Sequence, residues 1–571
     1  MVPQTLDTDI LILGAGGAGL FAALHAHKTA PELSITVAVK GLLGKCGCTR
    51  MVQGGYNVAL AKEDSVERHF MDTIEGGKWL PDQELAWKPV TLAVERIREL
   101  ENELGCFFDR NPDGTVHQKA FAGQTFDRTV HKGDLTGIEI MNRLAEQVWA
   151  RRINRLEEHR AVELIKSSDG AAIAGVLFID MRTGDYVFVR AKAVLLATGG
   201  GPTMYRYHTP SGDKSCDGLA MALRAGLELR DMEMVQFHPT GLLAGTHTRM
   251  TGTVLEEGLR GSGGFLLGGD KERFMPAYDP QAERATRDLV SRAMFSEIRK
   301  GNTTPHGGLY ISMAHLGPER VRKEFKGMVE RCADCGFDLA GGLVEVVPTA
   351  HYMMGGVEFA ADCTTTLRGL FVAGEDSGGV HGANRLGGNG VANSTVFGAV
   401  AGDRMAAWVR EQGALVSPDV GELEKAMARC ERPLSVPRGD LESIRERLHD
   451  TMWERAGIIR DGPGLTRALA ELAALDGELD HTGIGSGERA FNLSWHDWLN
   501  LKSLVAVSRV IARAALARHD SRGAHYRDDF PDTGALDSSA YTSIRAEGEV
   551  VMKPVAFTRV RPGQSLLKHA A

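Results

Sequence analysis

Five short clusters rich in histidine, arginine and glutamate lie between residues 237 and 389, most of them flanked by glycine. They read FHPTG (237–241), EEGLRG (256–261), TRD (286–288), HYMMGG (351–356) and HGANRLGGN (381–389). A single histidine of this kind is more often a structural residue than a catalytic one. Periodic packing does not require five such clusters. The pattern therefore predicts a catalytic constellation.

The elements that must position these clusters begin at residue 8. TDILILG (8–14) is typical of a buried parallel strand, and a helical pattern follows the glycines. Gly14, Gly16 and Gly19 form G-x-G-x-x-G, which permits a tight turn and close approach to a pyrophosphate at the helix start. A purely structural turn is the alternative. The spacing favours dinucleotide binding.

Two distant segments and one lysine indicate FAD rather than NAD. The second strand, SITVAV, ends at Lys40, where many NAD folds place an acidic residue for the ribose. AVLLATGGG (193–201) and GLFVAGE (369–375) are strands that end in small residues and let the backbone approach a nucleotide. Glu375 could bond a ribose hydroxyl or simply be a surface carboxylate. Together the segments predict one nucleotide-binding domain interrupted by an insertion.

The composition excludes several classes of partner. The 571 residues carry a net charge of −8, which provides no basic surface for nucleic acid. No apolar run approaches the ~20 residues of a membrane span, and the first residues lack a signal-peptide pattern, so we expect a cytoplasmic protein that reaches the inner face of a membrane only through a partner. The eight cysteines are sparse, and Cys332 and Cys335 form half of a metal site, so we expect ordinary thiols and no metal.

At the clusters described above, and nearly from end to end, the chain resembles the flavoprotein subunits of the succinate dehydrogenase and fumarate reductase family, which also includes L-aspartate oxidase. The segments that carry the resemblance are DTIEGGKWL (72–80), NPDGTV (111–116), GDLTG (133–137), DMEMVQFHPTG (231–241), PTAHYMMGG (348–356), HGANRLGGN (381–389) and DSRGAHYRDDFPD (520–532).

The resemblance implies a role for each candidate residue. Arg287 would be the proton donor or acceptor, served by a relay through Glu257 and Arg260. The substrate would lie against His238, Glu256, His351 and Arg385. The cofactor would lie against Gly14, Ala15, Gly16, Gly17, Ala18, Gly19, Lys40, Cys48, Thr49, Gly54, Gly55, Ala197, Thr198, Gly199, Asp217, Glu375, Asn389, Gly390 and Val391. A structural ion-pair network made by the same charged residues is the alternative.

The resemblance also implies the fold and the reaction. We expect an α/β protein with a Rossmann-like FAD-binding domain (1–235 and 352–412), an inserted α+β capping domain (236–351), a helical domain (413–535) and a C-terminal tail (536–571). The enzyme would interconvert a saturated and an unsaturated dicarboxylate, or a related small acid, by hydride transfer at flavin N5, and pass electrons to an iron-sulfur protein. The alternatives are an oxygen-using amino-dicarboxylate oxidase resembling L-aspartate oxidase and a flavin-bound assembly subunit without turnover.

Three positions depart from the family pattern. Cys48 stands where respiratory members have the histidine that links covalently to the flavin, so we expect non-covalent FAD, with a thioether from Cys48 as the alternative. Glu256 replaces a threonine whose hydroxyl meets a substrate carboxylate. A carboxylate there would repel that group. Either Glu256 points elsewhere, or it is protonated, or the ligand presents an amine or hydroxyl donor at that end. Our hypothesis is a substrate other than plain succinate. Gly390 replaces a serine beside the flavin.

Overall fold

The computed structural model describes residues 2–245, 248–546 and 548–567. Within these residues the main sheet has seven strands in the order β6-β2-β1-β9-β8-β7, with β16 also paired to β9. Their bounds are β1 Gln4–Leu13, β2 Ile35–Val39, β6 Asn154–Glu157, β7 His159–Lys166, β8 Ile173–Asp180, β9 Tyr186–Leu196 and β16 Leu370–Val372. β1 pairs in parallel with β2 and β9, and β16 pairs in parallel with β9. The three predicted nucleotide-binding segments therefore end at one edge of one sheet.

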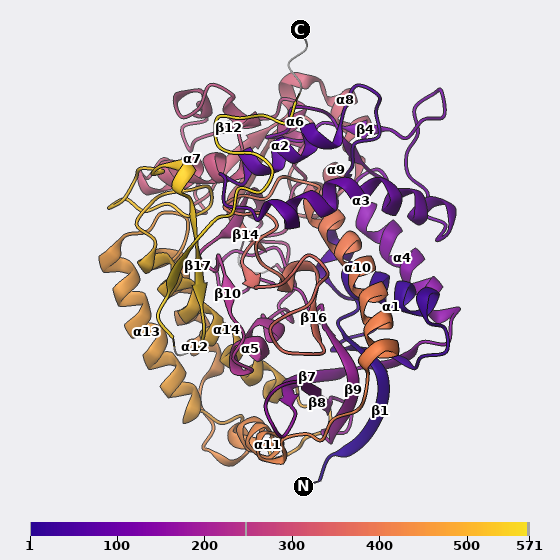
Figure 1. The fold of residues 1–571 in the computed structure, drawn as a ribbon. Helices are drawn as coiled ribbons and strands as arrows, with labels where there is room; N and C mark the ends of the chain where they lie inside the picture. Colours follow the sequence, from indigo (N-terminus) through magenta and orange to yellow (C-terminus); the bar gives the residue numbers. More distant parts are fainter. Residues whose placement is uncertain (1, 246–247, 547, 568–571) are drawn as a thin grey trace.

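Two helices cover the end of the sheet at which the glycine loop follows β1. They are α1 Gly17–Thr29, which follows β1, and α10 Asn389–Gln412, which lies beside α1 in Figure 1. A Cβ atom at Gly402 would lie 2.3 Å from the carbonyl oxygen of Ala22, so glycine is required for this close helix contact. The other helices of this region are α2 Val66–Gly76, α3 Gln83–Asn102, α4 Thr136–Trp149 and α5 Asp217–Arg224.

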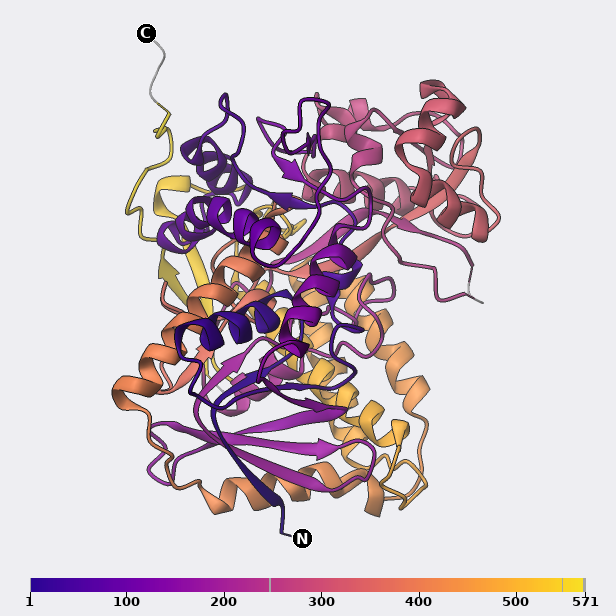
Figure 2. The ribbon, with the colours of Figure 1, turned by 90° about the vertical axis from the view of Figure 1, so that its right-hand side faces the viewer.

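The inserted region has its own sheet and its own apolar core. The strands are β11 Val235–Leu242, β12 Phe265–Leu267, β13 Leu309–Ser312 and β14 Leu343–Met353, in the order β11-β14-β13-β12. The helices are α6 Gly258–Gly261, α7 Arg287–Arg299, α8 Pro318–Glu324 and α9 Lys326–Asp334. Leu266, Met294 and Val344 belong to its core. Figures 1 and 2 show this cap at the top of the molecule, away from β7 and β8.

Four long helices follow α10. They are α11 Val420–Ser435, α12 Leu441–Arg455, α13 Gly462–Asp480 and α14 Leu493–Ala517. Asp419, Asp440, Asp461 and Asn492 each accept a hydrogen bond from the first turn of the helix they precede, which explains where the helices begin. The α/β fold with an inserted α+β cap and a helical region is confirmed. No helix in the described part of the chain is long and apolar enough to cross a membrane.

The last described residues return to the flavin-binding region. β17 Ala540–Ile544 and β18 Val551–Pro554 join β10 Leu229–Arg230 and β15 Gly356–Val357 in a small sheet of order β15-β10-β17-β18. A further small sheet contains β3 Tyr56–Asn57, β5 Thr129–Val130 and β4 Gln118–Lys119. The segment from 536 onward, which we expected as a tail, thus contributes strands. The limits of the domains stay a prediction.

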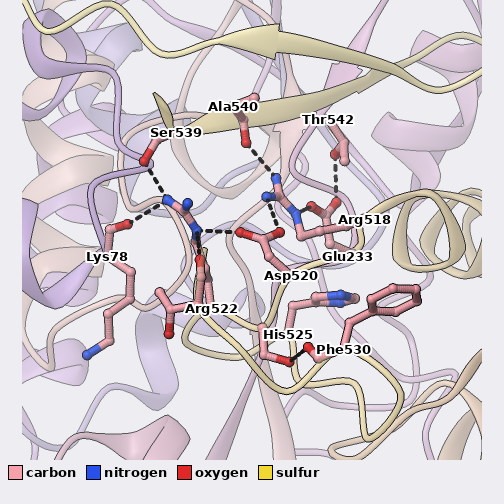
Figure 3. Close-up of polar contacts among 12 residues, drawn as sticks. Lys78, Glu233, Arg518, Asp520, Arg522, His525, Phe530, Ser539, Ala540 and Thr542 are labelled. Carbon is pink, nitrogen blue, oxygen red and sulfur yellow. Dashed lines mark hydrogen bonds and ion pairs between the residues drawn. The ribbon is translucent and has the colours of Figure 1, made fainter. Parts of the chain in front are cut away.

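A group of charged residues that are buried or half-buried, which we call the C-terminal ion cluster, ties this segment to the body. It consists of Glu233, Arg518, Asp520 and Arg522 (Figure 3). Arg518 bonds Glu233 through Nε and Asp520 through Nη1, and Arg522 bonds Asp520 through Nε. The cluster holds the loop after α14 close to the loop that ends at α10, where the amide of Ala524 donates to Ala383 O at 2.8 Å.

Candidate active site

A cavity of about 530 Å³ lies between the nucleotide-binding region and the cap. Its wall comes from the loop after β1, the short helix η1 Cys48–Met51, the ends of β9 and β16, α5, the cap, and the loop before α10. The cavity thus connects the predicted phosphate-binding loop with the histidine and arginine clusters.

The glycine loop has the geometry of a phosphate cradle. Gly14 has φ +107°, and a Cβ there would lie 2.1 Å from Ala197 O, so the turn requires glycine. The first helical residue, Gly17, donates its amide to Thr49 Oγ1 at 3.1 Å, and the N-cap residue Gly16 has no side chain to cap the helix. The open helix amides and the bare loop backbone suit the diphosphate of FAD.

Lys40 and Asp217 form an ion pair in the cavity wall, with Nζ and Oδ2 2.9 Å apart. Burial lowers the pKa of Lys40, whereas for Asp217 burial is outweighed by Arg160 and Lys40, which hold the pKa of the carboxyl below its usual range. Lys40 therefore forms part of a fixed polar wall. Glu375 also lines the cavity and accepts the Met353 amide at 2.9 Å.

Cys48 and the residues at the start of α10 also line the cavity. Burial, followed by the nearby Glu375 carboxylate, raises the pKa of the Cys48 thiol to about 12. Gly388 begins α10 without a side-chain cap, so the helix presents free amides toward the cavity. The side chain of Asn389 is engaged elsewhere, with its Oδ1 bonded to Asn57 Nδ2 and His69 Nε2.

The structure brings most of the predicted site residues to this one cavity. Those that line it are Gly14, Ala15, Gly16, Gly17, Ala18, Lys40, Cys48, Thr49, Gly54, Gly55, Ala197, Thr198, Gly199, Asp217, His238, Glu256, Glu257, Arg287, His351, Glu375, Arg385, Gly390 and Val391. Gly19, Arg260 and Asn389 lie behind the wall: Gly19 packs on Gly14 O, and Arg260 supports Glu257.

The cavity is also lined by residues that the predicted set omits, among them Gln53, Asp134, Arg331 and Tyr352. Gln53 adjoins the predicted pair Gly54 and Gly55, and Asp134 and Tyr352 fall inside motifs that carry the family resemblance. Nothing in the sequence around Arg331 distinguishes it from the other charged residues of a surface helix.

Two of the histidines that line the cavity come from paired strands of the cap. His238 lies on β11 and His351 on β14, and their ring centroids are 5.4 Å apart. The Thr240 amide donates to His238 Nδ1 at 3.3 Å, which leaves Nε2 to carry the proton of the neutral ring. Burial, then Arg287, holds the pKa of both rings well below the usual value. Both histidines are therefore neutral groups at physiological pH.

Arg287, at the start of α7, forms a bidentate ion pair with Glu257. Arg287 Nη2 lies 2.8 Å from Glu257 Oε2, and Nε lies 3.2 Å from Oε1. Arg260 bonds the same Oε1 at 3.0 Å from the side away from the cavity. Burial acts to raise the pKa of Glu257, but the two arginines outweigh it and lower the pKa. The predicted series Glu257, Arg260 and Arg287 is thus in direct contact.

Arg385 differs from Arg287 because no carboxylate in the described residues pairs with it. Its guanidinium carbon lies 4.3 Å from the ring centroid of Tyr352, and its buried Nε has no hydrogen-bond partner among those residues. Burial, followed by repulsion from Arg287, lowers the pKa of Arg385 to about 10. A Cβ at Gly390 would lie 3.0 Å from Arg385 Nη1, so glycine leaves room for this side chain. An anionic ligand would complete the site.

Glu256 lies in the cavity wall and is paired from behind. Its Oε2 atom is 3.0 Å from Nζ of Lys119 on β4. Burial raises the pKa of Glu256, although Lys119 opposes that effect. The ion pair was not predicted from the sequence.

The cysteines and other metal-ligand residue types form no metal centre within the described residues, where no group of three or more His, Cys, Asp or Glu side chains could hold an ion. All eight cysteines, including Cys332 and Cys335, are free thiols.

Comparison with known proteins agrees with this arrangement. Residues 9–391 match the family model of the FAD binding domain, and residues 445–566 match that of the fumarate reductase flavoprotein C-terminus.

Relatives match almost the whole chain. A subunit of the fumarate reductase (CoM/CoB) of Methanothermobacter marburgensis is 39% identical over 93% of this chain and 96% of its own length. The fumarate reductase flavoprotein subunit of Mycobacterium tuberculosis is 35% identical over 98% and 99% of the two chains. The solved quinol fumarate reductase flavoprotein of Escherichia coli, a variant, superposes with a TM-score of 0.92 at 33% identity, over 98% and 99% of the two chains. The chain is a member of the FAD-dependent oxidoreductase family of fumarate reductase and succinate dehydrogenase flavoproteins.

Proposed function

We propose that this protein interconverts a saturated and an unsaturated small carboxylic acid of the succinate and fumarate type. The observation that carries the proposal is Arg385: a buried guanidinium without a carboxylate partner in the described residues, in the same cavity as Arg287 and beside the cofactor cradle. The relatives named fumarate reductase support the same reaction class.

In this proposal each side chain has a separate task. Arg385 and the neutral His351 hold one carboxylate of the substrate, because a guanidinium fork gives two charge-assisted hydrogen bonds. His238 donates its Nε2 hydrogen to a carboxylate oxygen of the substrate, which polarises the adjacent double bond. Burial of the cavity under the cap excludes water and strengthens these contacts.

The proton is handled by Arg287 at its guanidinium nitrogens. An arginine is a weak acid, so its proton must be replaced from behind. Glu257 contacts two of its nitrogens, and Arg260 contacts Glu257, which gives a continuous path. Bound FAD would supply the two-electron step, with hydride exchanged at N5.

The cofactor in this proposal is non-covalent FAD. A thiol with its pKa raised to about 12 is a poor nucleophile, which argues against a thioether from Cys48. Because relatives are named as subunits, we also propose that electrons enter or leave through a separate iron-sulfur protein.

The test is anaerobic mixing of the purified flavoprotein with a panel of saturated small acids while the flavin absorbance is followed. We expect at least one acid to bleach the flavin in the wild type, and Arg287→Gln to remain yellow while it still binds that acid. Bleaching of Arg287→Gln at the wild-type rate would contradict the proposed role. Peroxide formed from aspartate under air would favour the oxidase instead.

A further inference from the structure

The polar groups around the substrate part of the cavity separate into two ends. One end, which we call the donor end, consists of Arg287, Arg385, His238 and His351. Arg385 has an unpartnered buried Nε, and His238 carries its proton on the nitrogen that Thr240 does not bond. This end is suited to a carboxylate.

A second group of cavity-lining residues, which we call the acceptor end, consists of Gln53, Asp134 and Glu256. The buried atoms Gln53 Oε1 and Asp134 Oδ2 have no hydrogen-bond partner in the described residues. Gln53 is 91% buried and Glu256 is 97% buried, since their exposed fractions are 9% and 3%. Each unpaired acceptor of this kind costs about 1–3 kcal/mol when it is removed from water.

Contacts around these three residues show that they are neighbours. Lys119 Nζ bonds both Glu256 Oε2, at 3.0 Å, and Gly133 O, next to Asp134, at 3.3 Å. Gln53 Nε2 donates to Val254 O at 3.0 Å, two residues before Glu256. This bond orients the amide, and its buried oxygen Oε1 has no hydrogen-bond partner among the described residues.

Within the described residues, the nearby cations bond only one of these three acceptor groups, Glu256. Lys119 pairs with Glu256 through one oxygen only, and no salt bridge joins Asp134 to a base in the described residues. Arg331 also lines the cavity, but its hydrogen bond goes to Val254 O. A second substrate carboxylate placed at this end would meet Glu256 and Asp134 as like charges, which is unfavourable in a buried site.

We propose that the substrate is an asymmetric acid, with a carboxylate at the donor end and an N–H or O–H donor, such as an amide, ammonium or hydroxyl, at the acceptor end. Glu256 and Asp134 are then the residues that select it over a plain dicarboxylate. This inference rests on the proposed function, because it assumes that the same cavity binds the reacting acid.

The experiment measures dissociation constants from the perturbation of the flavin spectrum, without oxygen, for four acids of similar length: succinate, succinamate, 4-hydroxybutyrate and 4-aminobutyrate. Succinamate is the matched probe, since it replaces one carboxylate of succinate by an amide of the same shape. We expect the wild type to bind succinamate at least about tenfold more tightly than succinate, a difference of about 1.4 kcal/mol.

Two isosteric variants test the assignment. Glu256→Gln removes the charge and supplies a donor, so it should reverse the preference and bind succinate more tightly. Asp134→Asn should shift the ratio in the same direction, and it provides an independent test if Glu256→Gln folds poorly. Glu424→Gln, at an exposed position on α11, should leave the ratio unchanged.

The outcomes separate this inference from the proposed function. Tighter binding of succinate than of the three other acids by the wild type, with the ratio unchanged in both variants, would overturn the inference and leave the function standing. Failure of all four acids, and of fumarate, to perturb or oxidise the flavin would overturn both.

Discussion

Arg385 and Arg518 are both almost completely buried, yet they have opposite surroundings. All three nitrogen positions of Arg518 are bonded, to Glu233, Asp520 and Ala540 O (Figure 3). For Arg518, burial alone would lower the pKa, but Glu233 and Asp520 outweigh it and raise the pKa. Arg385 has no carboxylate partner in the described residues, and its pKa is lowered.

The difference teaches how to distinguish a structural buried charge from a functional one. In the C-terminal ion cluster the protein satisfies its own charges, and the result is a brace between the end of the chain and the loop before α10. In the cavity, donors and acceptors are left open on two sides. A buried charge that the protein does not neutralise is a site for a ligand.

The largest effect should come from Arg287→Gln in the cavity. Loss of a positioned proton donor typically lowers the rate by about 10²–10⁴-fold, while the fold stays intact because Gln can still bond Glu257. Turnover with an artificial electron donor measures the loss. Arg299→Gln, on the exposed side of the same helix, is the control and should retain the wild-type rate.

Arg518→Met should affect stability instead. It would leave Glu233 buried without its main partner, which costs about 3–5 kcal/mol of unfolding free energy. Urea unfolding measures this loss. The comparison would be broken if Arg518→Met unfolded at the same urea concentration as the wild type.

Arg385→Lys should keep the positive charge but lose the planar guanidinium group, which can form two parallel hydrogen bonds with a carboxylate. We expect the KM for the acid to rise about 10-fold to 100-fold, because one of two charge-assisted bonds is lost. The unfolding free energy should change by less than about 1 kcal/mol, in contrast to Arg518→Met. A normal KM for Arg385→Lys would mean that the carboxylate binds elsewhere.

The pH dependence of stability gives a further comparison of the two regions, because a histidine with a lowered pKa lies in the cavity and another lies near the C-terminal ion cluster. The pKa of His351 in the cavity and of His525 near the C-terminal ion cluster is held well below the usual value, first by burial and then by neighbouring arginines. The unfolded chain therefore binds more protons below about pH 6.5, and stability present above that pH is lost as the pH falls.

Each histidine contributes at most about 1.4 kcal/mol per pH unit to this loss. His351→Gln and His525→Gln should each flatten the dependence of unfolding free energy on pH. A bound carboxylic acid should reduce the contribution of His351, because an anion favours the protonated ring, and should leave that of His525 unchanged. Equal ligand effects on both would contradict the assignment of His351 to the cavity.

The smallest effect is expected at Cys48. Acid precipitation of the wild type should release the flavin into the supernatant, and Cys48→Ser should retain a normal flavin content. Flavin that stays with the wild-type pellet but is released from Cys48→Ser would show a thioether.

Patterns among neighbouring residues were sufficient to predict the main helices and strands described here. The strand before Gly14, the glycine turn itself and the α11 to α14 helices depend on neighbours in sequence, and the structure confirms them. The strands at 540–554 were not foreseen, because β17 joins β18 to the body of the protein by pairing with β10, which is two residues long and lies far away in the sequence.

Prediction of the site from the sequence is limited in the same way, by contacts between residues that lie far apart in the chain. Histidine and arginine clusters predicted the donor end, but the acceptor end depends on contacts between distant residues. The Lys119 partner of Glu256 follows from the small sheet that contains β4, and no spacing in the sequence indicates that Arg331 reaches the cavity. Whether a buried charge such as Arg385 has a partner is a property of the tertiary structure alone.

The most direct test of the account is thermal unfolding of the wild type and of Arg385→Met, each with and without an acid that perturbs the wild-type flavin. At about 100 times its Kd, the acid should stabilise the wild type by about 2.7 kcal/mol. We predict that Arg385→Met is at least as stable as the wild type without the acid and gains nothing from it. An Arg385→Met protein that is strongly destabilised, or that is stabilised by the acid as much as the wild type, would contradict the claim that the open charge of Arg385 is the binding site.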